Sequence, residues 1–185
     1  METKKLGVLL LLAGIYAAHA FTEDAMKTPD LKDTRLEGPL AVKADRLFRN
    51  RIADPLMRET IFEEARRAFV LRDDDEDNGG AKGNWRGEFW GKSMLCAARV
   101  ADYLDDAALK AWIPGECARL AETADADGYI GSYASATNCV LTGADLDRDE
   151  CNTNWNLWGR KYTIWALLEA FRVTGDAAAR GTAVP

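Results

Sequence analysis

Residues 85–92 read Trp-Arg-Gly-Glu-Phe-Trp-Gly-Lys, and residues 155–162 read Trp-Asn-Leu-Trp-Gly-Arg-Lys-Tyr. Each motif leads into a segment whose apolar side chains recur at the three-to-four-residue spacing of an α-helix. The first segment runs from about Gly91 to Leu104 and the second from about Leu157 to Val173. Each motif therefore predicts the start of a helix that carries tryptophan, glycine and charged side chains.

Two more helices are expected from their capping signals and apolar spacing. One runs from about Asp54 to Leu71, because Asp54 is a good N-cap residue and Pro55 suits the first helical position. The other spans about Asp106 to Thr123, with Asp106 as its cap. Pro114 lies inside this pattern and is expected to kink or split the helix, since proline removes a backbone donor.

The chain is predicted to be all-α. The stretch Tyr129–Tyr133 is the one candidate for a short extended segment. Gly175, in the sequence Thr174-Gly175-Asp176, is expected to end the last helix. Helical periodicity alone allows an ordinary helical bundle as well as an α/α toroid built from helical hairpins.

The composition of the two motifs suits sugar binding. Aromatic rings cover the apolar C–H faces of a sugar, while neighbouring charged and amide groups bind its hydroxyls. The alternative is a structural plug, in which Arg86 and Glu88 pair and the rings pack beneath the fold. Trp112 and Trp165, on apolar helical faces, are expected in the core. The candidate sugar-binding residues are Trp85, Arg86, Glu88, Trp90, Trp155, Trp158, Lys161 and Tyr162.

Catalytic residues are not assigned. Glu88 is the one carboxylate inside an aromatic motif, and glycoside hydrolysis normally uses a second carboxylate at a defined distance. No partner can be paired with Glu88 from the sequence. Asp127 and Tyr129 are expected to be mainly structural, with Gly128 supplying a positive φ and Asp127 capping the turn.

The N-terminus has the features of a secretory signal peptide. Lys4 and Lys5 precede the apolar run 6–17, and Ala18-His19-Ala20 is a small-x-small cleavage site. An uncleaved anchor is the alternative. The expected organisation is a signal peptide at 1–20, a polar lead-in at 21–39 and a helical domain at 40–185. The mature protein is expected to be secreted or periplasmic, with no membrane partner after cleavage.

Histidine and net charge exclude several function classes for the mature chain. His19 is the only histidine and lies in the expected signal peptide. Ser-His-Asp and Cys-His catalysis, and metal sites that contain histidine, therefore need a residue that the mature chain lacks. The formal net charge of −6 at pH 7 disfavours nucleic acid and anionic membranes as partners.

The four cysteines and the acidic run are interpreted structurally. Cys139 and Cys151 bracket a polar loop and are expected to form a disulfide in an exported protein, whereas Cys96 and Cys117 are expected to be buried thiols. None of the cysteines is spaced C-x-x-C, so the sequence does not predict a self-contained zinc site. Residues 73–80 are strongly acidic, but they do not fit the EF-hand calcium pattern, so a solvated loop is favoured.

Three motifs in order resemble a known family. The motif at 85–92, then Asp-Gly-Tyr-Ile-Gly-Ser-Tyr at 127–133, then the motif at 155–162 with its apolar helix and Thr-Gly-Asp, resemble the N-terminal part of glycoside hydrolase family 127. These are β-L-arabinofuranosidase-like enzymes with an (α/α)6 barrel. The resemblance covers about Leu40 to Asp176. It implies a secreted glycosidase that acts on arabinofuranose-type or related plant-like glycans.

The resemblance also implies what this chain lacks. Family members are retaining enzymes with a zinc-held cysteine thiolate as nucleophile and a glutamate as acid/base, and these residues lie downstream of the matched segment. None can be carried onto a position here, so no cofactor is expected in this chain. Many relatives also have a sugar-facing histidine where this chain has Tyr162, preceded by Lys161. The identity of the sugar is therefore open.

Length sets the remaining expectation. A family barrel needs six helical hairpins and this chain supplies about two, so it is interpreted as a truncated N-terminal arc that is inactive alone. One alternative is a non-enzymatic helical protein that binds carbohydrate or serves as a scaffold. Another is a fragment of an (α/α)6 polysaccharide lyase or uronyl hydrolase, in which Arg86, Arg160 and Lys161 would contact acidic sugars. The oligomeric state is left open.

Overall fold

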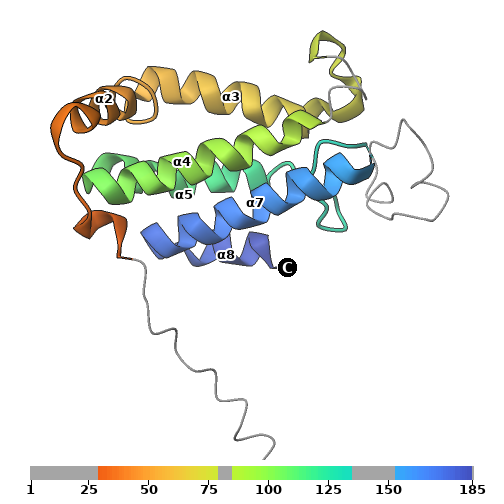
Figure 1. Ribbon diagram of the computed structural model, residues 1–185. Helices are drawn as coiled ribbons and strands as arrows, with labels where there is room; N and C mark the ends of the chain where they lie inside the picture. The colour runs from red at the N-terminus through yellow and green to blue at the C-terminus, as the bar shows by residue number, and fades with distance from the viewer. Residues whose placement is uncertain (1–28, 79–84, 135–152, 185) are drawn as a thin grey trace, which may run out of the picture. The chain divides into compact units, whose positions relative to one another are not determined.

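A computed structural model of the chain describes residues 29–78, 85–134 and 153–184 (Figure 1). The chain divides into two units, Met1–Asp30 and Leu31–Pro185, and every helix described below belongs to the second. The described residues contain no β-strand, so the prediction of an all-α fold is confirmed for them. The stretch Tyr129–Tyr133 is irregular and bent rather than extended in a strand.

The described residues form α-helices joined by short turns and loops. The α-helices are α2 (Gly38–Arg49), α3 (Pro55–Leu71), α4 (Glu88–Leu104), α5 (Ala107–Ala121), α7 (Thr153–Thr174) and α8 (Ala177–Ala183). The 3-10 turns include η1 (Leu31–Asp33), η2 (Arg72–Asp74) and η3 (Glu76–Asn78), and residues 85–87 form another directly before α4. The helices expected around 54–71, 91–104, 106–123 and 157–173 are all present, although α4 and α7 begin earlier than predicted.

The capping predictions are confirmed. Asp54 accepts a hydrogen bond from the backbone N–H of Met57 at 2.8 Å, which starts α3. Asp106 accepts one from the backbone N–H of Leu109 at 2.9 Å, which starts α5. Gly175 follows α7 with a φ of 75°, a left-handed conformation that glycine adopts without strain.

Three features differ from the sequence-based expectations. Helix α2 was not predicted, because Gly38 and Pro39 at its start were interpreted as the end of a polar lead-in, and the helix has no buried residue. Helix α8 was also missed; Asp176 caps it by accepting from the backbone N–H of Ala178 at 3.1 Å. Pro114 does not split α5, which is one helix in which Ile113 and Cys117 are buried on either side of the proline.

Helices α4 and α7 lie side by side and run in the same direction (Figure 1). The indole of Trp158 donates to Glu88, and further along Arg172 Nη2 donates to Asp102 Oδ2 at 2.9 Å. In both pairs the α7 residue lies 70 positions after its α4 partner. Because this offset stays constant along the helices, their axes are parallel and their starts lie at the same end.

Helices α5 and α8 pack behind α4 and α7 and run in the opposite direction (Figure 1). Each is reached by a two-residue connection, Asp105–Asp106 before α5 and Gly175–Asp176 before α8. Short helix connections of this kind produce antiparallel neighbours. The described helices therefore include two hairpins, α4–α5 and α7–α8, stacked side by side.

The core lies between these hairpins and α3. Phe62 of α3 contacts Trp90 of α4 and Trp112 of α5 edge-on, with ring centroids 6.3 Å and 4.9 Å apart. Trp112, which was expected in the core, is half-buried and packs against the buried cluster. Other large side chains that are almost fully buried are Phe69, Met94, Leu109, Ile113, Leu120 and Leu167.

Candidate functional site

The two tryptophan motifs meet where α4 and α7 begin. A Cβ added at Gly91 would lie 2.5 Å from the carbonyl carbon of Tyr162, and one added at Gly87 would lie 2.4 Å from Ser132 Oγ. At Gly91 the close atoms belong to the backbone of α7, so no side chain fits there, whereas a side chain at position 87 would require Ser132 to shift. The same contacts hold the turn around Ser132 against the start of α4. The three motifs that are separated in sequence are thus brought together.

The turn has the structural role that was expected. Gly128 has a φ of 85°, and Asp127 Oδ1 accepts a hydrogen bond from the backbone N–H of Tyr129 at 3.0 Å. Tyr129 is buried and its hydroxyl donates to Asn156 Oδ1 at 3.4 Å. The turn therefore supports the start of α7 from behind.

Glu88 lies in the first turn of α4 and both of its oxygens are engaged. Lys92 Nζ lies 2.7 Å from Oε1, one helical turn later, and the indole N–H of Trp158 donates to Oε2. The pairing of Arg86 with Glu88, which the structural alternative required, is wrong; Arg86 instead lies over the Trp85 ring, with its Cζ 5.0 Å from the centroid. Glu88 thus orients Trp158 across the helix pair.

Four aromatic side chains follow one face of α7, and we call them the aromatic row. The ring centroids of Trp155 and Trp158 are 6.3 Å apart, those of Trp158 and Tyr162 are 5.4 Å apart, and those of Tyr162 and Trp165 are 6.3 Å apart. Trp155, Trp158 and Trp165 are 44%, 41% and 46% exposed. Exposed rings of this size are uncommon on a soluble surface unless they contact something.

Positively charged groups lie over the aromatic row. Lys161 Nζ lies 3.5 Å from the Trp158 centroid and 4.1 Å from the Tyr162 centroid. Lys92 Nζ lies 4.9 Å from the Tyr162 centroid. Ammonium groups are attracted to the electron-rich faces of aromatic rings, so these contacts are stabilising. They also add positive charge to the row.

The aromatic row leads into a groove of about 680 Å³ between α4, α7 and the N-terminal helices. Tyr162 and Trp165 line one side, Lys92 and Arg99 supply its charges, and much of the remaining surface is apolar, including Phe48 of α2. No acidic side chain is among the described residues that line it. The groove and the row together form an aromatic and cationic surface.

Two predicted positions are corrected by the structure. Trp90 was expected to face a sugar, but it is fully buried, because it shares the apolar face of α4 with Met94, Ala97 and Ala101. Trp165 was expected in the core, but it is exposed at the far end of the aromatic row. Its position three residues after Tyr162, on the same helical face, is the sequence signal that could have identified it.

The other predicted site residues lie at the helix starts. Trp155, Trp158, Lys161 and Tyr162 form or border the aromatic row. Trp85 is 37% exposed and contacts the exposed ring of Phe89, with centroids 5.4 Å apart. The structure therefore groups most of the predicted residues and adds Arg99 and Trp165 to them.

Two buried donors lie behind this surface. Asn156 is 2% exposed, and its Nδ2 has no hydrogen-bond partner among the described residues. Arg86 Nη1 is likewise buried and without such a partner. Buried donors are normally satisfied, so each is a place where a bound water molecule or ligand group would be stabilised.

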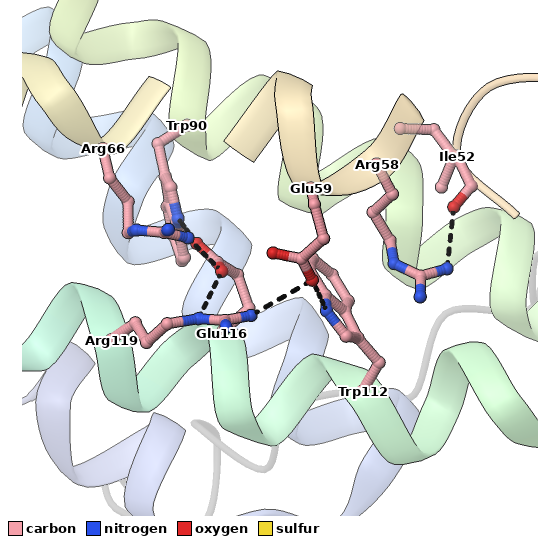
Figure 2. A network of polar contacts seen from close by, with 8 residues as sticks. All are labelled: Ile52, Arg58, Glu59, Arg66, Trp90, Trp112, Glu116 and Arg119. Atoms are coloured by element: carbon pink, nitrogen blue, oxygen red, sulfur yellow. Dashed lines mark hydrogen bonds and ion pairs between the residues drawn. The ribbon is translucent and has the colours of Figure 1, made fainter. Parts of the chain in front are cut away.

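A second polar cluster joins α3, α4 and α5 (Figure 2). Glu116 is fully buried, and it accepts from the indole N–H of Trp90 at 2.8 Å and from Arg119 Nε at 3.0 Å. Arg66 of α3 pairs with the same carboxylate. Beside it, the indole N–H of Trp112 donates to Glu59 at 2.7 Å. With its carboxylate oxygens occupied, Glu116 ties three helices together.

The cysteines give a test of the described packing. Cys96 was expected to be buried but its side chain is exposed, although partial burial raises the pKa of its thiol. Cys117 is buried as predicted, and burial raises the pKa of its thiol to about 12. The predicted disulfide between Cys139 and Cys151 lies outside the described residues.

We therefore expect iodoacetamide to label Cys96 before Cys117. The reactive species is the thiolate, and a raised pKa lowers the thiolate fraction at any given pH. As the pH is raised, labelling of Cys96 should increase at a higher pH than labelling of a free cysteine does, because the pKa of the Cys96 thiol is raised. Cys117 should stay protected until urea unfolds the chain. Peptide mapping by mass spectrometry reads each cysteine separately. Equal labelling of the two thiols in the native protein would contradict the described packing.

No family model, curated protein or solved structure matches this chain. Within the described ranges, no helix is both long enough and apolar enough to span a membrane. In the same part of the chain, no three Cys, His, Asp or Glu side chains are grouped to hold a metal ion.

Proposed function

We propose that this chain is a secreted glycoside hydrolase-like protein of the family 127 type and that it binds a glycan along the aromatic row. The observation that supports this most is the aromatic row, in which Trp155, Trp158 and Trp165 are exposed and Tyr162 is half-buried between them, with Lys161 beside it. Rings stack on the apolar faces of sugars, and neighbouring N–H donors bind hydroxyl oxygens. An arabinofuranose-type or related plant-like glycan is the proposed ligand class.

The arrangement of the helices supports an arc of an (α/α)6 toroid. Parallel neighbours α4 and α7, each followed by an antiparallel helix behind, are the repeating unit that such a toroid requires. Leu157, Ile164 and Leu168 of α7 are each about 40% exposed. In a toroid, each hairpin buries its apolar side chains against the next. We propose that a further helical hairpin covers this side of α7.

We expect binding without hydrolysis by this chain alone. Both carboxylate oxygens of Glu88 are engaged, by Lys92 and by the indole of Trp158, and glycoside hydrolysis normally needs a second carboxylate at a defined distance. The same observation favours the second candidate, a non-enzymatic carbohydrate-binding protein. Release of reducing sugar by the purified chain would separate the two and would contradict the expectation of inactivity.

Replacing Trp165 with alanine is expected to weaken glycan binding about tenfold, which corresponds to about 1.4 kcal/mol. The ring is 46% exposed and stacks on Tyr162, so its loss removes a contact surface for a sugar at the end of the row. Isothermal titration calorimetry with arabinan oligosaccharides measures the affinity. A ring that contacts no ligand would leave the affinity unchanged.

Leu56→Ala is the matched control. Leu56 lies on α3, outside the row and the groove, and is 77% exposed, so its replacement also removes an exposed apolar side chain. We expect binding to stay within about twofold of the original protein, since surface substitutions change stability by about 0.5 kcal/mol or less. Equal weakening by Trp165→Ala and Leu56→Ala would count against a sugar site on the aromatic row.

A further inference from the structure

The charges around the aromatic row and the groove are unevenly distributed. The chain carries a formal net charge of −6, yet the described residues that line the groove include Lys92 and Arg99 and no acidic side chain. The two carboxylates nearest to these cations are already paired. Glu88 lies 2.7 Å from Lys92, and Glu169 lies 3.0 Å from Arg172 and 3.7 Å from Arg99.

Lys161, by contrast, has no acidic partner among the residues that the structure describes. It forms no ion pair with any described residue, and its ammonium group lies over the rings of Trp158 and Tyr162 instead. The side chain is exposed on the same face of α7 as those rings. An ammonium held against an exposed aromatic surface, in an acidic protein, is available for an anion that arrives with a ligand.

We propose that the aromatic row binds an acidic glycan, in which a sugar carboxylate pairs with Lys161 while the sugar ring stacks on a neighbouring exposed tryptophan of the row. This inference rests on the proposed glycan-binding function and specifies its ligand class. A uronic acid has both parts: a pyranose ring with an apolar C–H face and a carboxylate at its edge. Lys161 Nζ, 3.5 Å from the Trp158 centroid, would place one donor beside that edge.

The positive charges also favour a uronic acid over a neutral sugar as the ligand. A neutral sugar uses the rings but needs no ammonium group, because its hydroxyls are bound as well by uncharged donors. Lys92 and Arg99 line the groove beyond Tyr162 and, although paired with Glu88 and Glu169, present further cationic N–H donors to an anionic ligand. A chain of several uronic acids would therefore meet successive cations as it follows the row toward the groove.

Oligogalacturonides and their fully methyl-esterified forms test this proposal. The two ligands share one backbone and differ in charge at the carboxyl group. We expect the purified full chain to bind the acidic form at least about tenfold more tightly by calorimetry, with a preference that falls as salt rises. Lys161→Gln should remove most of this preference and leave the affinity for the ester within about twofold. Lys161→Arg, which keeps the charge, should retain it.

Lys43→Gln is the matched control, since it makes the same change of net charge at an exposed position on α2 that does not line the groove. It should leave both affinities within about twofold. Equal binding of the acid and the ester, with binding abolished by Trp165→Ala, would overturn the acidic-glycan proposal and keep the proposed function. Equal loss of preference in Lys43→Gln and Lys161→Gln would also overturn it. Binding of neither ligand and of no arabinan oligosaccharide would contradict the proposed function itself.

Discussion

Glu116→Ala is expected to lower the free energy of unfolding by about 3–5 kcal/mol. The carboxylate is fully buried and satisfies donors from Trp90, Arg66 and Arg119. Its removal leaves the buried indole N–H of Trp90 without an acceptor and Arg66 without a counter-charge. Removing one partner of a buried ion pair costs more than the pair contributes, because the remaining charge is still out of water. Urea unfolding followed by circular dichroism measures the loss.

Two variants control for the change at Glu116. Glu116→Gln keeps the shape of the side chain and one carbonyl acceptor, so it should be less destabilising than alanine. Glu122→Ala removes an exposed carboxylate just after the same helix and should change stability by about 0.5 kcal/mol or less. A Glu116→Ala variant as stable as Glu122→Ala would show that the cluster in Figure 2 does not hold α3, α4 and α5 together.

Local signals explain how much of the fold was predictable. Asp54 and Asp106 each supply a cap whose chemistry acts within three residues, so their helices could be placed from sequence. Helix α2 has no capping side chain, since Glu37 at its start makes no capping bond, and none of its residues is buried, although Pro39 in its first turn is the same start signal as Pro55 in α3. Pro114 does not split α5, because burial of Ile113 and Cys117 on the two sides of it is a tertiary effect that propensity does not include.

The candidate site was predictable at the level of motifs but not of individual rings. Trp90 and Trp158 both precede glycine, yet Trp90 is buried and Trp158 is 41% exposed. The difference depends on which face of each helix meets its neighbour. Tertiary contacts decide which helix face is buried, and a Trp-Gly pair in the sequence does not indicate it. The pairing of Glu88 with Trp158 across 70 residues is likewise set by the parallel packing of α4 and α7.

Gly91→Ala is expected to destabilise the protein by about 2–3 kcal/mol, although alanine is the better helix former. A Cβ at this position would lie 2.5 Å from the carbonyl carbon and 2.6 Å from the carbonyl oxygen of Tyr162. These atoms belong to the backbone of α7 and cannot rotate away, so the two helices must separate. The gain of about 1 kcal/mol in helix propensity offsets only part of this cost. Thermal unfolding measures the difference.

Gly115→Ala is the matched control and should have the opposite sign. Gly115 lies inside α5, and a Cβ there would meet no atom within 4 Å. The same substitution should therefore stabilise the protein by up to about 1 kcal/mol. Separation of α4 and α7 in Gly91→Ala should also break the contact of Trp158 with Glu88 and weaken glycan binding. Equal stabilisation by both substitutions would show that α4 and α7 do not approach each other as closely as described. It would also show that their close contact does not hold the aromatic row in place.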